Sequence, residues 1–281
     1  MKNGQPGGKT PIQPIAAAAW LLVTHTFLSL LSSTIGGVGG YGVYLLSYLV
    51  PVGMYVFFAR KWGVYTAFAP TRVACARVLP LLPLFLCAVM MVSTLTIELM
   101  TLLGLPISGG VVEGNGFFPD LLTDCLAPAF LEEGLMRFAI LSLLLMWDGQ
   151  HAVWVSAILF SLQHASLYQA PYAFVGGFFL ALAVVWGETP IFAFVFHFLN
   201  NLLSLFLQYC AIWWGEDVGL WISLGVWFVL FAAGAIGFLT LWRRGELRRR
   251  AHGAPVNWQE LVYSPLTAWA VMMLVFTILQ S

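Results

Sequence analysis

The sequence predicts an all-α integral membrane protein, a polytopic bundle whose helices cross a bilayer about eight times, with a ninth C-terminal span. Of its 281 residues, 60% are hydrophobic and only 9% are charged, whereas an average soluble domain carries roughly 25% charged residues. The mean hydropathy is +0.89. A soluble protein of this size could not cover so much apolar surface. The formal net charge of zero gives no reason to expect nucleic acid as a partner.

Apolar runs of about 20 residues predict where the spans lie. In chain order they cover residues 14–35, 40–59, 79–104, 120–147, 151–168, 172–187, 189–213 and 219–242, and a further run covers 262–280. The first run continues to about Ile35 without a small-x-small cleavage site, which favours a retained span over a signal peptide. We therefore expect residues 1–281 to form a single membrane domain.

The basic residues favour one orientation of this domain. With the N-terminus in the cytoplasm, every lysine and arginine except Arg137 falls on the cytoplasmic side, as the positive-inside rule requires. The loops on the other side carry Glu113, Asp120, Glu216 and Asp217 and no basic residue. The expected location is the cell (plasma) membrane, with membrane lipids as partners and a cytoplasmic N-terminus.

Three charged residues stand in the middle of the run 120–147, within the segment LAPAFLEEGLMRFAIL, although a charge inside a membrane costs about 2.5–3.5 kcal/mol on insertion scales. Glu133 and Arg137 are four residues apart and share a helix face, so they are expected to form an ion pair. Glu132 points about 100° away from Glu133 around a helix. It is therefore the one carboxylate of this segment that Arg137 leaves free.

Two later runs supply imidazole and amide groups. His164 lies one turn after Phe160, and His197 lies one turn before Asn201. A carboxylate and a histidine can together take a proton from water, while a second histidine and an amide can donate hydrogen bonds to a developing oxyanion. This set can hydrolyse an amide without a serine or cysteine nucleophile. Glu132 and the two histidines could equally hold a zinc ion with an open position, although no H-E-x-x-H motif is present.

These residues resemble the CPBP family, the CAAX-protease and bacteriocin-processing family of intramembrane proteases. The family's three motifs are E-E-x-x-x-R, F-x-x-x-H and H-x-x-x-N, and here they read Glu132-Glu133-x-x-x-Arg137, Phe160-x-x-x-His164 and His197-x-x-x-Asn201. Gly176 and Gly177, in the run before the last motif, are also similar to the family. The resemblance covers about residues 120–205, the expected catalytic core. Met136 and Phe138 depart from its usual residues, outside the chemistry.

The resemblance implies an intramembrane endopeptidase that acts on a membrane-associated protein or peptide. It implies that Glu132 activates water with the help of His164, and that His197 and Asn201 hold the oxyanion. Glu133, Arg137 and Phe160 are expected to support them. No cofactor is favoured, and a zinc ion held by Glu132, His164 and His197 is the alternative.

Two non-protease functions are also compatible with a polar site in a membrane. One is a non-catalytic membrane protein that binds peptides or confers immunity. The other is a transporter in which Glu132 and the histidines relay protons. The sequence shows no duplicated halves and no paired broken helices, which argues against a transporter.

Overall fold

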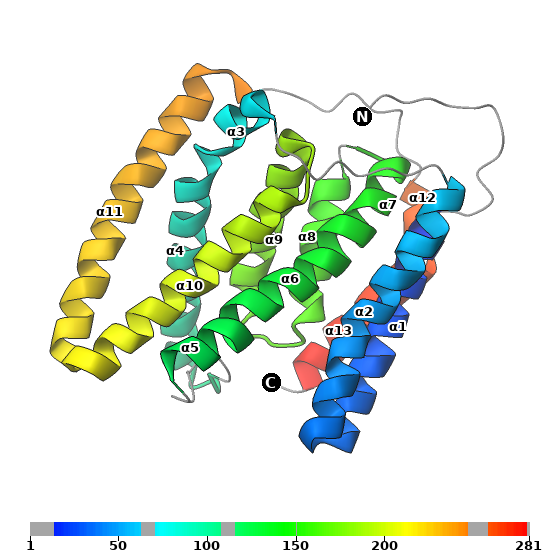
Figure 1. The fold of residues 1–281 in the computed structure, drawn as a ribbon, viewed down its shortest axis with the longest axis horizontal. Coiled ribbons are helices and arrows are strands. Elements are labelled where there is room, and N and C mark those ends of the chain that lie inside the picture. The colour runs from blue at the N-terminus through cyan, green and yellow to red at the C-terminus, as the bar shows by residue number, and fades with distance from the viewer. Residues whose placement is uncertain (1–13, 63–70, 108–115, 150, 247–257, 280–281) are drawn as a thin grey trace.

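The computed structural model describes residues 14–62, 71–107, 116–149, 151–246 and 258–279, and within these ranges it contains helices and no strand (Figure 1). The predicted all-α helix bundle is therefore confirmed. The helical elements, in chain order, are α1 (Pro14–Ile35), α2 (Gly37–Trp62), α3 (Arg72–Val78), α4 (Leu81–Leu103), α5 (Phe117–Asp120), η1 (Leu121–Leu126), α6 (Ala127–Glu133), η2 (Gly134–Ile140), α7 (Leu141–Trp147), α8 (Ala152–Gln163), α9 (Ala170–Gly187), α10 (Ile191–Trp214), α11 (Glu216–Arg243), α12 (Trp258–Val262) and α13 (Pro265–Leu279).

Every predicted span falls on one of these helical runs. Six helices among the described residues are long and apolar enough to cross a membrane, and α8 and α13 are shorter apolar helices. The predicted span 120–147 is a continuous helical run, 117–147, in which η1 and η2 are π-helical. With 12 residues, α8 is only about 18 Å long. It ends before the predicted residue 168, so the link to α9 begins at His164.

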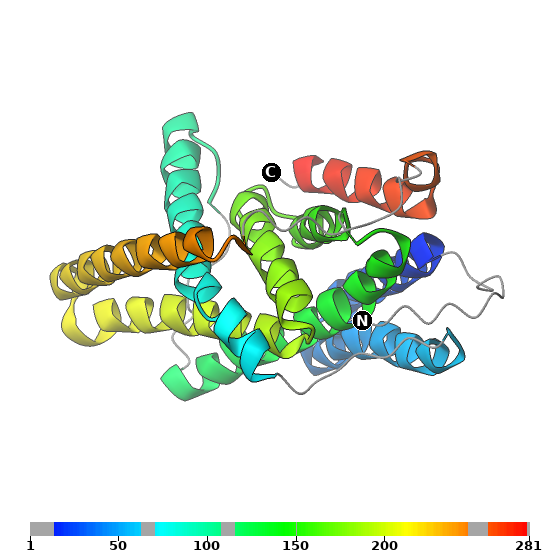
Figure 2. The ribbon, with the colours of Figure 1, turned by 90° about the horizontal axis from the view of Figure 1, so that it is seen from above.

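The helices form two flanks around a central group (Figures 1 and 2). On one flank α1 packs against α2 and α13, and the indole N–H of Trp269 donates to the Thr26 hydroxyl at 3.0 Å. On the other flank α4 packs against α11. The run 117–147, α8, α9 and the first half of α10 lie between the flanks, and they carry all three motifs.

Close approach of α11 to the start of α4 depends on a glycine. A Cβ atom at Gly237 would lie 2.4 Å from the backbone oxygen of Pro80, a distance that real Cβ atoms do not reach. Gly225, on the same helix, has nothing within 4 Å of the equivalent position.

We expect Gly237→Ala to lower the melting temperature of the detergent-solubilised protein, because α11 must move away from α4 to admit the methyl group. Gly225→Ala is the matched control. It should leave the melting temperature unchanged or raise it, since alanine is the better helix former. Equal melting temperatures for the two variants would contradict this account of the α4–α11 contact.

Candidate active site

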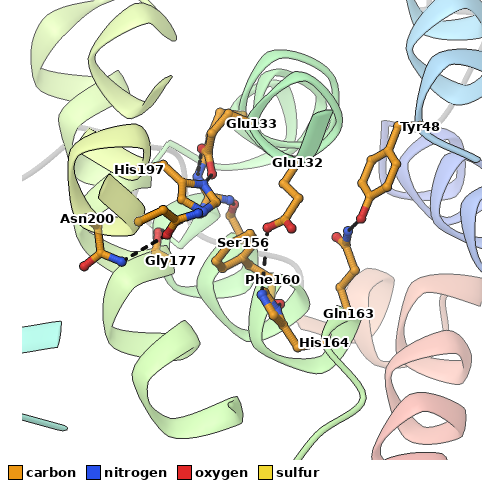
Figure 3. A network of polar contacts seen from close by, with 12 residues as sticks. Tyr48, Glu132, Glu133, Ser156, Phe160, Gln163, His164, Gly177, His197 and Asn200 are labelled. Atoms are coloured by element: carbon orange, nitrogen blue, oxygen red, sulfur yellow. Dashed lines mark hydrogen bonds and ion pairs between the residues drawn. The ribbon is translucent and has the colours of Figure 1, made fainter. Parts of the chain in front are cut away.

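The two adjacent glutamates of α6 face different neighbours, as their helical spacing predicts. Glu133 Oε2 lies 3.2 Å from Arg137 Nε, and both side chains are 0% exposed. Glu132 turns away from this pair and approaches His164 (Figure 3). The expected Glu133–Arg137 ion pair is confirmed, and so is the expectation that Arg137 leaves Glu132 free.

Arg137 ties the run 117–147 to the next two helices. Its guanidinium donates to the Ser156 hydroxyl of α8 at 3.2 Å and to the Gly177 carbonyl of α9 at 3.3 Å. The same guanidinium lies over the ring of Phe160, 4.6 Å from its centroid, a cation–π contact. The buried cation is thus paired with a carboxylate, bonded to two oxygens and covered by an aromatic ring, and a charge in a membrane interior needs such partners.

Glu133 also binds the third motif, a contact that the sequence analysis did not predict. Its Oε1 atom lies 2.9 Å from His197 Nδ1. Because a carboxylate oxygen can only accept a hydrogen bond, Nδ1 carries a hydrogen and is the donor of this bond. His197 therefore has its ring fixed and presents only Nε2 to other partners. One carboxylate links Arg137 to α10.

Glu132 and His164 face each other across a short gap. Their closest atoms, Glu132 Oε2 and His164 Nε2, are 3.8 Å apart, and the two side chains are 14% and 20% exposed. His164 Nδ1 lies 2.8 Å from the Phe160 carbonyl oxygen. That carbonyl can only accept, so Nδ1 is protonated and Nε2 of the neutral ring is an acceptor.

Asn201 is positioned by a proline on the opposite helix. Pro128 has no N–H to offer the Asp124 carbonyl four residues earlier. Asn201 Nδ2 donates to this carbonyl at 3.2 Å. An amide nitrogen has two hydrogens, so one fixes the side chain and the second remains for another acceptor.

The four predicted catalytic side chains line one cavity. Its volume is about 660 Å³, and Glu132, His164, His197 and Asn201 all contribute to its wall. Several further polar side chains line the same cavity and were not predicted from the sequence: Thr123, Gln169, Tyr172, Asn200, Ser204 and Gln208. A signal for part of this set was present, because His197, Asn201, Ser204 and Gln208 recur every three or four residues and form a polar stripe along α10.

The supporting residues of the motifs pack against this site. The ring of Phe160 meets those of His164 and His197 edge-on, with centroids 4.8 and 6.0 Å away. A Cβ at Gly177 would lie 3.0 Å from Phe160 Cδ1, so a side chain here would require Phe160 or α8 to shift by a few tenths of an ångström. At Gly176 the nearest atom would be 3.5 Å away, an ordinary contact. Phe138, one of the two departures, packs edge-on against Tyr55.

The predicted zinc ligands are not arranged as a metal site. Among the residues that the structure describes, no three histidine, cysteine, aspartate or glutamate side chains are grouped so that they could hold an ion. His197 Nδ1 already donates a hydrogen bond to Glu133, and His164 Nδ1 donates one to the Phe160 carbonyl. Each imidazole could therefore offer only Nε2.

The fold and this site define an integral membrane protein with a glutamate–histidine site buried among its helices. Residues 114–203 match the sequence profile of a family described as "Type II CAAX prenyl endopeptidase Rce1-like". The matched segment contains all three motifs, and the match confirms the resemblance to the CAAX-protease family. The match covers about a third of the chain, the part that carries the candidate site. Neither a curated protein nor a solved structure matches the chain.

We expect Arg137→Gln to reduce the amount of folded protein in the membrane, because it leaves Glu133 without its cation. Breaking a buried pair in this way costs about 3–5 kcal/mol. The double variant Glu133→Gln with Arg137→Gln should recover part of the folded protein, measured by size-exclusion chromatography in detergent. It should not recover cleavage, since His197 loses its anionic partner. Arg243→Gln, a change at an exposed arginine, is the control. A double variant no better folded than Arg137→Gln would contradict the pairing.

Proposed function

We propose that this protein is an endopeptidase of the glutamic type that hydrolyses a peptide bond of a membrane-associated protein or peptide. The observation that carries the proposal is the meeting of Glu132, His164, His197 and Asn201 in one cavity of a membrane helix bundle. The residues at this cavity can supply a base and two oxyanion donors. No serine or cysteine nucleophile is required by this arrangement.

The base in the proposed mechanism is the Glu132 carboxylate, assisted by His164. Both atoms that face the 3.8 Å gap, Glu132 Oε2 and His164 Nε2, are hydrogen-bond acceptors. A water molecule has two hydrogens and satisfies both acceptors at once. Held in this way, its oxygen lone pairs point toward the cavity, where a substrate carbonyl can approach.

In the proposed mechanism, the proton that Glu132 takes from water is passed on to the leaving nitrogen. As the water oxygen bonds to the carbonyl carbon, Glu132 takes one proton, and the carbonyl oxygen becomes negative. When the tetrahedral intermediate collapses, the C–N bond breaks and Glu132 returns the proton to the leaving nitrogen. The products are a new carboxyl terminus and a new amino terminus.

The oxyanion in this mechanism is held by His197 and Asn201, which are one turn apart on α10. Asn201 offers its second amide hydrogen. His197 offers Nε2–H when its ring is doubly protonated, a form that the Glu133 carboxylate at Nδ1 stabilises. Donors fixed before the reaction starts stabilise the transition state without reorganising, which is the source of their effect on rate.

We further propose that the reaction uses no metal, that the protein resides in the cell membrane among its lipids, and that its N-terminus is cytoplasmic. The metal-free form is supported by the placement of the described histidine, cysteine, aspartate and glutamate side chains, no three of which are grouped so that they could hold an ion. The orientation is supported by the distribution of basic residues. A non-catalytic peptide-binding protein is the competing function, and the first of the following variants separates the two.

Glu132→Gln should abolish cleavage, because the amide cannot take a proton from water. Folding and binding of the peptide should be retained, since the change is nearly isosteric and Glu132 has no ion pair with Arg137. The measurement is cleavage of membrane-tethered peptides by purified protein. Glu98→Gln, the same change at an exposed residue of α4, is the control and should remain active. Full activity of Glu132→Gln would refute the mechanism, and a wild type that binds but never cleaves would favour the peptide-binding function.

Asn201→Ala should retain a small residual rate, because it removes one oxyanion donor and leaves His197. The loss of one such donor typically lowers kcat by roughly a hundred- to a thousand-fold. Single-turnover kinetics on correctly folded protein would measure it. A loss as complete as that of Glu132→Gln would assign Asn201 a larger role than the mechanism gives it.

Chelators should not inhibit the enzyme, and elemental analysis should find no stoichiometric zinc in active preparations. One zinc per chain, lost together with activity in His164→Ala, would replace the metal-free mechanism with the metalloprotease alternative.

A further inference from the structure

The lysines and arginines of the described residues gather at one end of the helix bundle. The basic end is formed by the last turn of α2, by α3 and by the end of α11. Apart from Arg137, all lysines and arginines of the described residues lie there: Arg60, Lys61, Arg72, Arg77, Arg243 and Arg244. At this end Arg77 pairs with Glu246 at 3.7 Å, and Arg244 donates to the Ala76 carbonyl, so α3 is fastened to the end of α11.

The acidic end lies opposite, where α4 and α10 finish and where α5 and α11 begin (Figure 1). Among the described residues, the charged side chains at or near this end are all acidic: Glu98, Asp120, Asp124, Glu216 and Asp217. Lys2, Lys9, Glu113 and the arginines at 248–250 lie outside the described residues. In the sequence they adjoin the ends that match their sign, since Lys9 precedes α1, Glu113 lies between α4 and α5, and residues 248–250 follow α11.

The cavity of the site extends toward the acidic end. Five polar residues that line the cavity form what we call its mouth: Thr123, Gln169, Asn200, Ser204 and Gln208. Thr123 precedes Glu132 on the run that starts at the acidic end, and Gln169 immediately precedes α9. Ser204 and Gln208 follow His197 by 7 and 11 residues on α10, about 10 and 16 Å nearer the acidic end.

Toward the basic end the site is closed by packed side chains. Glu133 and Arg137 are fully buried, and Met136, Ile140 and Leu141 beyond them are also 0% exposed. Phe196, which precedes His197, is buried against Phe85, with the two rings stacked 5.8 Å apart. Glu132 and His197 therefore stand at the inner end of a cavity whose polar walls lead to the acidic end.

We propose that the site takes its substrate from the non-cytoplasmic side of the membrane. The basic end of a membrane protein faces the cytoplasm, so the mouth opens on the opposite side. All five mouth residues carry amide or hydroxyl groups that can pair with the N–H and C=O groups of an extended peptide. The substrate class is a peptide segment that leaves the membrane on the non-cytoplasmic side, such as an exported peptide or the juxtamembrane part of a membrane protein.

The location of the mouth rests on geometry and charge alone, whereas cleavage of such a peptide also rests on the proposed function. The direct test is therefore one that requires no catalysis. Single cysteines are introduced as Ser204→Cys at the mouth, Asp217→Cys at the acidic end and Arg243→Cys at the basic end, all three at exposed positions. Cys75, which is partly exposed, is replaced by serine in all of them.

Intact cells of the expression host are treated with a maleimide that does not cross membranes. We expect Ser204→Cys and Asp217→Cys to be labelled equally before and after the cells are permeabilised, and Arg243→Cys only afterwards. Folding of each variant is checked by size-exclusion chromatography in detergent. If folded Ser204→Cys is unlabelled in intact cells while Asp217→Cys is labelled, the mouth does not open on that side and the proposal is wrong. Labelling of Arg243→Cys in intact cells would overturn it by reversing the orientation.

A second measurement separates this proposal from the proposed function. The same cleavable peptide is fused to a single transmembrane helix so that it emerges either outside or in the cytoplasm. The enzyme should cleave the external fusion and leave the cytoplasmic one intact. Cleavage of the cytoplasmic fusion alone would refute the orientation and keep the protease. Cleavage of neither, with Ser204→Cys labelled from outside, would refute the protease and keep the orientation.

Discussion

The site depends on one buried carboxylate, that of Glu133, which lies between Arg137 and His197. Two charges removed from water cost several kcal/mol each unless they are paired and hydrogen-bonded. Arg137 is both paired and hydrogen-bonded, because it contacts Glu133, Ser156, the Gly177 carbonyl and the ring of Phe160. These contacts join the run 117–147 to α8 and α9, and the bond from His197 joins it to α10. The contacts that neutralise Arg137 therefore also hold together the helices that carry all three motifs.

In this arrangement two adjacent glutamates have different roles, one structural and the other chemical. Glu133 is fully buried and holds neighbours in place, whereas Glu132, about 100° around the helix, reaches the cavity and His164. Backbone groups complete the positioning. The Phe160 carbonyl sets the tautomer of His164, and the Asp124 carbonyl, to which Pro128 cannot donate, accepts a hydrogen bond from Asn201. The π-helical segments η1 and η2 flank α6 on both sides, and such irregular turns are often found at functional sites.

Much of this could be predicted from the sequence, for physical reasons that also explain what was missed. Apolar runs of membrane-spanning length identified the helices, and the i,i+4 rule identified the Glu133–Arg137 pair, because both signals are local. The bond between Glu133 and His197 joins residues 64 positions apart, and no local pattern reports such a contact. The π-helical turns and the early end of α8 were also missed, since hydropathy measures burial in lipid and not the hydrogen-bonding register of the backbone. The polar stripe of Ser204 and Gln208 was visible at helical spacing, but it became interpretable only once the cavity beside it was known.

The central claim is that Glu132 and His164 hold the attacking water while His197 and Asn201 hold the carbonyl oxygen. An experimental structure with a bound phosphinate peptide tests this most directly, because the two phosphinate oxygens occupy the places of the attacking water and the oxyanion. The account predicts one oxygen between Glu132 and His164, the other within hydrogen-bond distance of His197 Nε2 and Asn201 Nδ2, and the peptide chain leading out past Ser204 and Gln208. Both oxygens on a bound metal ion, or a peptide bound away from Glu132, would contradict it.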